Sequence, residues 1–158
     1  MQNLEKYAAK LGTYLQQNHW YIVTAESCTG GWIAQAITAI AGSSAWFERG
    51  FITYSYAAKQ EILGVNPKTL AKYGAVSEQV VLEMVNGALQ YSQSQVGIAT
   101  SGIAGPTGGT DDKPVGTVWI AYAFPHNTYA KLYHFHGNRY TIREQTVITA
   151  LQQLCAEA

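Results

Sequence analysis

The sequence predicts a single α/β domain over residues 1–158, an α/β/α layered fold built around a mixed β-sheet. Helix-like and strand-like segments are mixed along the chain without an internal repeat or a linker, which is typical of one layered α/β domain. The length of 158 residues is about that of one domain. The last two predicted strands, 117–124 and 129–135, follow each other with no helix between them, which favours a mixed sheet over a purely parallel one.

The first part of the chain predicts helices and strands in alternation. A helix is expected over residues 2–18, because apolar side chains share one helical face there: Leu4, Tyr7, Ala8, Leu11, Tyr14 and Leu15. Residues 21–24, Tyr-Ile-Val-Thr, form a short apolar run that indicates a buried strand. A helical pattern follows from 32 to about 40, a second strand over 47–56, and a short helix over 59–63.

The second part of the chain carries helix-start signals before its strands. Asn66 followed by Pro67 is typical of an N-cap and a proline at the first helical position. Ser77 is a candidate N-cap for the next helix, whose apolar pairs repeat every four residues as a core-facing stripe does. The remaining elements are a strand over 96–100, a glycine- and proline-rich loop over 101–116, the strand pair given above, and a closing helix from about 141.

Composition and charge narrow the class of protein. Hydrophobic residues make up 47% of the chain and charged residues 13%, which indicates a globular protein. Ten basic and ten acidic side chains cancel, which argues against a protein that coats nucleic acid or an anionic membrane. The first twenty residues lack the apolar stretch of a signal peptide, and no run reaches membrane-spanning length, so a cytoplasmic protein is expected.

The segment Ala25-Glu-Ser-Cys-Thr-Gly-Gly31 lies between a predicted strand and a predicted helix. In open α/β sheets, ligands bind at the carboxyl ends of strands, where such loops lie. Glycines allow close approach of the backbone, and a helix N-terminus offers unpaired N–H groups to an anion or oxyanion. Ser27 either caps the helix or attacks a substrate, and the residues alone leave both interpretations open. The segment does not match the Gly-x-Ser-x-Gly elbow.

Two further segments could contribute chemistry. The loop over 100–110 follows a strand and combines flexible backbone with several hydroxyls, which suits a phosphate or a ribose, although a plain surface crossover is the alternative. It lacks the Gly-Lys-Ser/Thr ending of a Walker A loop. Lys59 opens a short predicted helix; a lysine there is usually solvated, but beside Ser27 in a dry pocket it could act as a base.

The remaining candidates have weaker signals. His134 and His136 share one face of a strand, but no third metal ligand is evident, so no metal site is predicted. Arg139 and Arg143 lie at the start of the last helix, where cations oppose the macrodipole; they indicate either an anionic partner or simple surface exposure. Cys28 could be an activated thiol, but nothing in the sequence ranks it above Ser27.

Together these segments resemble the CinA C-terminal-domain family, over about residues 4 to 154. The motifs that carry the resemblance are Ala25–Gly31, Thr53-Tyr-Ser, Lys59, Leu63-Gly-Val65, Gly74-Ala-Val-Ser77, Thr100-Ser-Gly-Ile-Ala-Gly-Pro-Thr-Gly-Gly109 and Lys113-Pro-Val-Gly116. They are long and occur in the family's order, so the resemblance is specific. It implies a stand-alone amidohydrolase that converts nicotinamide mononucleotide (NMN) to nicotinate mononucleotide and ammonia, without a cofactor.

The resemblance also implies roles for individual residues. Ser27 matches the nucleophile and Lys59 its base, with Tyr54 in the same site. Ser101, Gly102, Gly105, Thr107, Gly108 and Arg139 match positions that hold the nucleotide. Thr29, Gly30 and Gly31 are expected to bind the substrate through backbone N–H groups that stabilise the oxyanion. The chain departs from the family at Tyr56, where many relatives have an asparagine. A homodimer or higher homo-oligomer is expected, with no nucleic-acid or membrane partner.

Two alternatives to NMN deamidation remain from the sequence. A catalytically silent nucleotide-binding paralogue would keep the pocket without the chemistry, and Tyr56 is the feature that supports it. An amidase that acts on another small amide is the second alternative, because a serine and a lysine do not by themselves choose the substrate.

Overall fold

The computed structural model of the chain describes residues 2–157. In chain order its elements are α1 (Gln2–Gln17), β1 (Ile22–Glu26), α2 (Trp32–Thr38), the 3₁₀ turn η1 (Ser43–Ala45), β2 (Phe47–Ile52), α3 (Tyr56–Leu63), α4 (Pro67–Tyr73), α5 (Glu78–Gln90), β3 (Val96–Gly102), β4 (Thr117–Phe124), β5 (Asn127–His134) and α6 (Arg139–Ala156).

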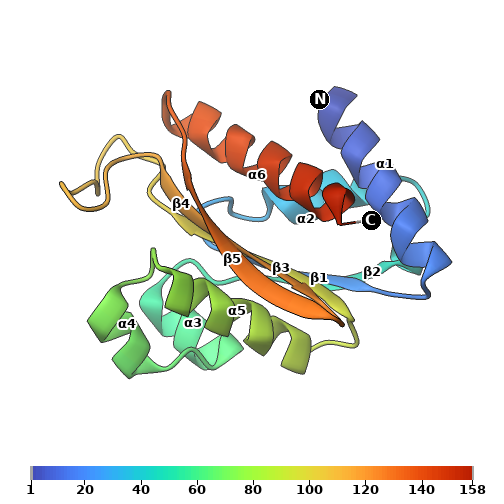
Figure 1. Ribbon diagram of the computed structural model, residues 1–158, viewed down its shortest axis with the longest axis horizontal. Helices are drawn as coiled ribbons and strands as arrows, with labels where there is room; N and C mark the ends of the chain where they lie inside the picture. The colour runs from blue at the N-terminus through green and yellow to red at the C-terminus, as the bar shows by residue number, and fades with distance from the viewer. Residues whose placement is uncertain (1, 158) are drawn as a thin grey trace.

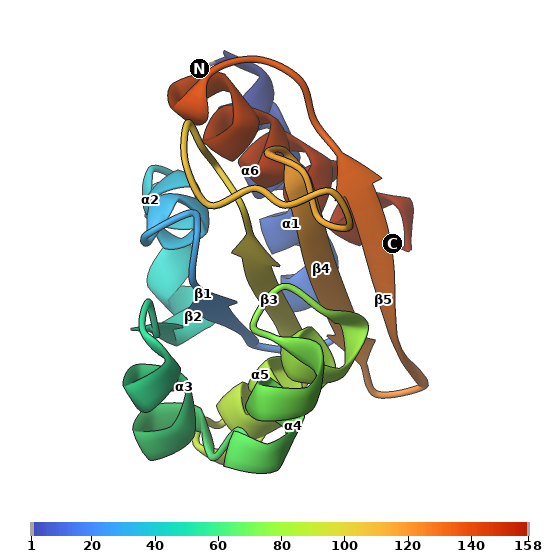
Figure 2. The same ribbon diagram turned by 90° about the vertical axis from the view of Figure 1, so that its left-hand side faces the viewer.

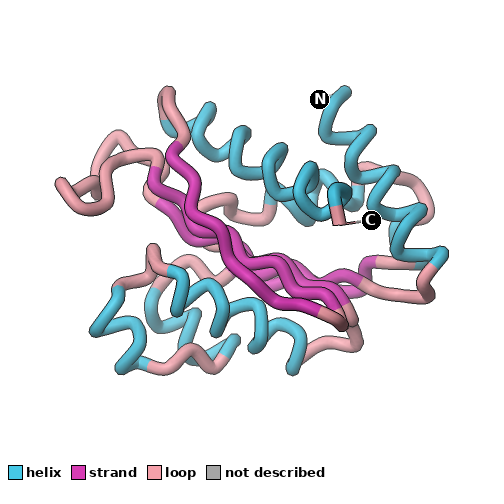
Figure 3. The backbone as a smooth tube through the Cα atoms, in the orientation of Figure 1, coloured by secondary structure: helices cyan, strands magenta, loops and turns pink. Residues whose placement is uncertain are grey.

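The five strands form one mixed sheet in the order β2-β1-β3-β4-β5. Strand β1 pairs in parallel with both β2 and β3, whereas β4 pairs antiparallel with β3 and with β5. The tube drawing in Figure 3 shows the strands side by side in one twisted layer, with helices on both sides of it. The mixed sheet predicted from the adjacent last strands is confirmed.

Helices cover both faces of this sheet, as predicted. Figure 1 shows α1, α2 and α6 on one face and α3, α4 and α5 on the other. Each face has its own cluster of buried apolar side chains, one including Ile22 and Ile98 and the other including Val23 and Ala99. Successive residues of β1 and β3 thus enter opposite cores, which is why these central strands read as continuous apolar runs.

Several element boundaries differ from the sequence-based expectation. The second strand ends at Ile52 and not at residue 56, because Ser55 caps α3 by accepting a hydrogen bond from the N–H of Ala58. Helix α6 begins at Arg139, two residues before the expected start, because Asn138 accepts from the N–H of Thr141. The N-caps predicted at residues 66 and 77 are confirmed.

The topology creates a crevice at the carboxyl ends of β1 and β3. The chain passes from β1 to β2 through α2 on one face, and from β2 to β3 through α3, α4 and α5 on the other face. The strand order therefore reverses between β1 and β3, and ligands bind at such switch points in open α/β sheets. Figure 2 looks toward this edge, where the loop after β3 and the turn before α5 face each other. Within residues 2–157, no helix combines the length and apolar character needed to cross a bilayer.

Candidate active site

Ser27 lies directly after β1 and does not cap the helix that follows. Its N–H donates to the carbonyl of Thr100 at 3.1 Å, which fixes it to the end of β3. The first turn of α2 is capped instead by the Glu26 carboxylate, which accepts from the N–H groups of Ile33 at 2.8 Å and Ala34 at 3.1 Å. The capping interpretation of Ser27 is therefore wrong, and its hydroxyl is free for another task.

Glu26 is a site residue that the sequence reasoning missed. Its side chain is 1% exposed and also accepts a hydrogen bond from the hydroxyl of Thr29 at 2.6 Å. That hydroxyl lies 2.9 Å from the hydroxyl of Thr100 as well. The carboxylate thus joins the end of β1, the turn and α2. A negative charge at a helix N-terminus is favourable, so a glutamate beside this turn was the available sequence signal.

We expect Glu26→Gln to destabilise the protein by about 1–3 kcal/mol, because the amide places an NH₂ group against one of the N–H donors of α2. Urea unfolding monitored by circular dichroism measures this loss. Glu61→Gln, an exposed glutamate on α3, is the matched control and is expected to leave the midpoint unchanged. An equal shift in both variants would contradict the role of Glu26.

Lys59 meets Ser27 in the interior, which the sequence alone could not establish. The side chain is 1% exposed, and its Nζ lies 2.9 Å from Ser27 Oγ. The same nitrogen donates to the carbonyl oxygens of Thr53 at 2.8 Å and Tyr54 at 3.0 Å. Burial disfavours the ammonium form and lowers the pKa of Lys59 from 10.5 to about 8.

Three oxygen atoms surround the Nζ of Lys59. A neutral amine has two N–H bonds and one lone pair. Nζ donates to the two backbone carbonyls and to Ser27 Oγ, and the Ser27 hydroxyl donates to the Tyr54 carbonyl at 3.5 Å. When Lys59 loses one proton, its lone pair becomes available to the Ser27 hydroxyl at the same separation of 2.9 Å.

Cys28 lies beside Ser27 but is poorly suited to attack. Its side chain is 7% exposed and belongs to the apolar core on the α1–α2–α6 face. Burial, followed by the nearby Glu26 carboxylate, raises the pKa of the Cys28 thiol to about 12. Because the thiolate is the reactive form, the structure favours Ser27 over Cys28 as the nucleophile.

The two arginines of α6 contact the loops of the site. Arg143 donates to the carbonyls of Cys28 at 3.0 Å and Thr29 at 3.2 Å and holds the turn from the α6 side. Arg139 donates to the carbonyl of Gly105 at 2.8 Å and to the Tyr54 hydroxyl at 3.0 Å. Both guanidinium groups therefore position site segments, and Arg139 also faces the cavity.

A cavity of about 240 Å³ lies over Ser27 at the switch point. It is lined by Ser27, Cys28, Tyr54, Tyr56, Lys59, Ala75, Val76, Ser101, Gly102, Ile103, Ala104, Gly105, Thr107, Gly108 and Arg139. None of these residues is acidic, whereas two of them, Lys59 and Arg139, are basic.

Nine of the twelve residues expected in the site line this cavity: Ser27, Lys59, Tyr54, Ser101, Gly102, Gly105, Thr107, Gly108 and Arg139. The other three, Thr29, Gly30 and Gly31, do not line it; they build the turn below it. The hydroxyl of Thr29 faces Glu26, and the N–H of Gly30 donates to the carbonyl of Ser27 at 3.1 Å. Gly31 has a φ of 102° as the N-cap of α2.

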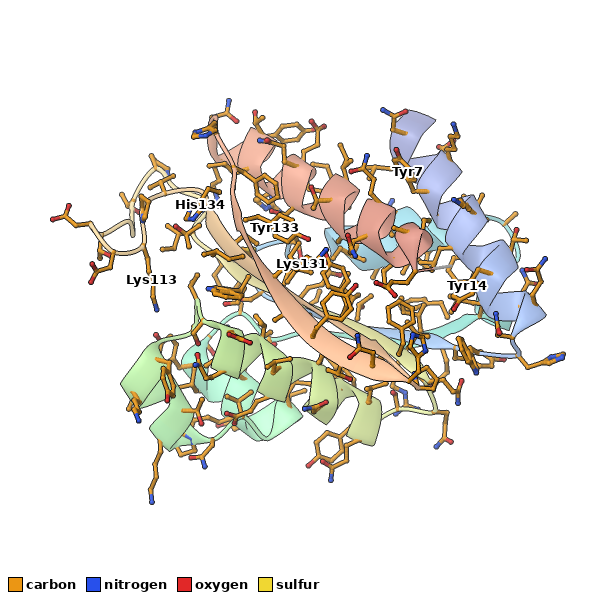
Figure 4. The ribbon with its side chains drawn as sticks, viewed as in Figure 1. Tyr7, Tyr14, Lys113, Lys131, Tyr133 and His134 are labelled. Atoms are coloured by element: carbon orange, nitrogen blue, oxygen red, sulfur yellow. The ribbon has the colours of Figure 1, made fainter. Side chains whose placement is uncertain are left out.

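The histidine pair shows no sign of a metal centre. Among residues 2–157, no group of three or more His, Cys, Asp or Glu side chains is arranged to hold a metal ion. His134 is the last residue of the exposed edge strand β5, and it is labelled in Figure 4.

Comparison with known proteins identifies a family and solved structures with the same fold. The sequence profile of the family described as "CinA C-terminal domain" matches residues 4–158. "Nicotinamide-nucleotide amidohydrolase PncC" of Enterobacter agglomerans is 50% identical over 155 residues, which covers 98% of this chain and 94% of that protein. The protein of the same name from Escherichia coli K12 is 49% identical over 152 residues, covering 96% and 92%. The crystal structure of the competence/damage inducible protein CihA from Agrobacterium tumefaciens superposes with a TM-score of 0.94 at 44% identity, covering 98% and 94%.

Proposed function

This chain belongs to the CinA C-terminal domain family, and from that premise we propose that it hydrolyses the carboxamide of NMN to nicotinate mononucleotide and ammonia. Relatives about 50% identical over nearly the whole chain carry the name nicotinamide-nucleotide amidohydrolase. The observation that supports this chemistry most strongly is the 2.9 Å approach of Lys59 Nζ to Ser27 Oγ, inside a cavity lined by no acidic residue.

In the first half of the reaction, Ser27 Oγ attacks the carboxamide carbon while neutral Lys59 takes the hydroxyl proton. The new C–O bond converts the carbonyl oxygen into an oxyanion. Collapse of this tetrahedral intermediate breaks the C–N bond, and Lys59 returns the proton to the departing nitrogen, so that ammonia leaves and an acyl-serine ester remains.

In the second half, water enters the place that ammonia left. Lys59 takes a proton from this water as it attacks the ester carbon. The ester bond then breaks, and the proton returns to Ser27 Oγ, which releases the carboxylate product and restores the serine. The proton at Nζ is thus taken and returned once in each half-reaction.

The oxyanion is stabilised by backbone N–H groups of the turn that are left without a protein partner. The Ser27 carbonyl accepts from Gly30 and the Cys28 carbonyl accepts from Arg143. In a trans peptide the N–H points away from the C=O, so the N–H groups of Cys28 and Thr29 point away from these partners. Neither donates a hydrogen bond to a backbone carbonyl within residues 2–157. Cys28 lines the cavity, so its N–H is the first candidate donor, a contribution worth roughly 3–4 kcal/mol.

The nucleotide is held by the loop after β3. Gly105 and Gly108 have φ angles of 78° and 92°, a region that side chains rarely adopt, and this conformation turns the backbone toward the cavity. Arg139 fixes this loop through the Gly105 carbonyl. Donors from the loop and a positive charge suit an anionic ligand.

Tyr56, at the family's asparagine position, lines the same cavity as Ser27 and Lys59 but hydrogen-bonds to neither of them. Its hydroxyl accepts a hydrogen bond from the N–H of Ala75 at 3.2 Å, and its ring is 51% exposed at the edge of the cavity. This position supports active chemistry over a silent binding paralogue, because Tyr56 leaves the contact between Ser27 and Lys59 in place.

Release of ammonia from NMN by the purified protein tests the proposal. We expect turnover of NMN and at least tenfold lower kcat/KM for free nicotinamide, which lacks the ribose phosphate that the loop binds. Tight binding of NMN without release of ammonia would support the silent paralogue. Faster turnover of nicotinamide than of NMN would support an amidase for another small amide.

The pH dependence of kcat/KM provides a second test of the Lys59 assignment. The base must be neutral, and its pKa is lowered to about 8. We therefore expect kcat/KM to rise with pH and to level off above about 8, with a single ionisation on the rising side. A profile that is flat from pH 6 to pH 9 would contradict the role of Lys59.

The homodimer or higher homo-oligomer and the cytoplasmic location stay predictions. They form part of the proposal through family membership, and size-exclusion chromatography with light scattering tests the first of them.

A further inference from the structure

The cavity over Ser27 continues past the ring of Tyr56 into a second hollow. We call the first cavity the inner compartment and the second the outer compartment. The outer compartment has a volume of about 270 Å³ and is lined by Tyr56, Gly74, Ala75, Val76, Ile103, Gly108, Thr110 and Lys113. Five of these residues, Tyr56, Ala75, Val76, Ile103 and Gly108, line the inner compartment as well. The two compartments are therefore neighbours that share one wall.

The inner compartment is too small to enclose a whole mononucleotide. Its volume is about 240 Å³, whereas cavities for ligands of that size measure about 300–1,000 Å³. With the carboxamide at Ser27, part of the substrate must extend beyond the inner compartment. The outer compartment is the adjoining space, and a ligand that reaches it passes the ring of Tyr56.

Lys113 brings a positive charge to the outer compartment. Figure 4 shows its side chain reaching from the loop after β3 toward the end of α4. The Nζ donates to the carbonyl of Tyr73 at 2.6 Å, which holds the side chain in place. An ammonium group has three donors, so two remain for a ligand. No acidic residue lines the compartment to compete with that ligand.

The backbone beside Lys113 adds further donors. Within the described residues 2–157, the N–H groups of Thr107, Gly108 and Gly109 donate no hydrogen bond to the protein. Gly108 has a φ of 92°, and successive N–H groups around a left-handed residue form a concavity that attracts anions. Thr110 accepts from the N–H of Lys113 at 3.1 Å, and its hydroxyl hydrogen remains available for a ligand.

Arg139, the cation expected to hold the nucleotide, has two other partners. Its two terminal nitrogens donate to the Gly105 carbonyl and to the Tyr54 hydroxyl. Its contacts make it a positioning residue for the loop and for Tyr54. Lys113 lies at the other end of the shared wall and contacts neither of those groups.

We propose that the outer compartment is the anion subsite of this enzyme, in which Lys113 and the N–H groups of the loop at Gly108 bind the phosphate of the mononucleotide. The inference rests on the proposed function, since it takes the carboxamide to lie at Ser27. It assigns the reacting end of the substrate to the inner compartment and the phosphate end to the outer one.

The test compares NMN with nicotinamide riboside, which has the same carboxamide and ribose but no phosphate. Dissociation constants are measured by isothermal titration calorimetry on Ser27→Ala protein, so that no turnover interferes. We expect Lys113→Gln in this background to weaken NMN binding by about ten- to hundredfold, the effect of one charge-assisted hydrogen bond, and riboside binding by less than about twofold. Lys72→Gln, an exposed lysine on α4 that lines neither compartment, is the matched control and is expected to change neither value.

Three results would overturn the inference. If Lys113→Gln weakened the binding of NMN and of the riboside equally, Lys113 would support the end of α4 through the Tyr73 carbonyl and would not bind the phosphate. If Ser27→Ala/Arg139→Gln lost affinity for NMN but not for the riboside, and the Lys113 variant did not, the phosphate subsite would lie at Arg139. A parent protein that binds NMN no more tightly than the riboside would mean that no anion subsite exists. If the protein bound NMN more tightly than the riboside, but the unmodified protein released no ammonia from NMN, the proposed function would be contradicted and the anion subsite would stand.

Discussion

Replacing Ser27 by alanine is expected to lower kcat for ammonia release from NMN by about 10⁴- to 10⁶-fold, the range measured when a serine nucleophile is removed from other hydrolases. The physical reason is that covalent attack at the carboxamide needs the Oγ atom held 2.9 Å from the Lys59 amine. KM is expected to change little, because Ser27 contributes one small side chain to a cavity with fifteen lining residues. Initial rates of ammonia release with a coupled assay give both constants.

Cys28→Ala is the matched control for this experiment. The two residues are adjacent, and Cys28 is buried with a pKa raised to about 12. Because the backbone N–H at position 28 is kept, kcat is expected to stay within about threefold, with a loss of stability of about 1 kcal/mol from the missing sulfur. A Cys28→Ala protein without activity beside an active Ser27→Ala protein would move the nucleophile to the thiol.

The architecture could be predicted well because its signals are local. Strands β1 and β3 are buried on both faces, so they appear in the sequence as uninterrupted apolar runs. The adjacency of β4 and β5 without a helix between them predicted the antiparallel pair that makes the sheet mixed. The end of β2 was harder to place, because Thr53 and Tyr54 favour strands by composition whereas Ser55 stops the strand by capping α3.

The site was only partly predictable, because its decisive contacts are between distant residues. The loops that contain Ser27 and Gly105 follow parallel strands, so their meeting at one edge follows from the topology. The approach of Lys59 depends on how the chain turns between the end of β2 and the start of α3, and no spacing rule encodes that. The roles of Glu26 and Arg143 were missed for a related reason, since both act on backbone groups of the turn, which the sequence pattern does not display.

The turn at Ser27 is held from two sides by opposite charges. The Glu26 carboxylate accepts from N–H groups on the α2 side, and the Arg143 guanidinium donates to carbonyls on the α6 side. A peptide group is planar, so a hydrogen bond that fixes its carbonyl also fixes the direction of its N–H. The N–H of Cys28 is therefore preorganised before substrate binds, which is the condition under which such a donor stabilises an oxyanion.

Lys59→Met is expected to lower kcat by about 10³- to 10⁴-fold, the upper range for loss of a general base. Methionine is similar in length and apolar, so it fills the buried position without a proton acceptor. Lys59→Arg is expected to be as inactive, because a guanidinium stays charged at every working pH. Lys68→Met, an exposed lysine on α4, is the control and is expected to retain full activity.

The same variant changes how stability depends on pH, and this readout does not depend on catalysis. The pKa of Lys59 is about 8 in the folded chain and 10.5 in its ordinary state. Between these values the unfolded chain holds a proton that the folded chain has lost, so the stability of the unmodified protein rises with pH across this window. Below about pH 8 both states are protonated, and the full penalty of the buried charge is present.

Because all other titrating groups are shared, the difference in unfolding free energy between the unmodified protein and Lys59→Met isolates this one group. We expect that difference to shift by roughly 3 kcal/mol in favour of the unmodified protein between pH 7 and pH 11. Urea unfolding of both proteins at each pH measures it. A difference that does not change with pH would mean that the pKa of Lys59 is near 10.5 in the folded state. In that case the amine would stay charged between pH 8 and pH 9, where the proposed scheme needs its neutral form, and the proton transfer from Ser27 would lose its acceptor.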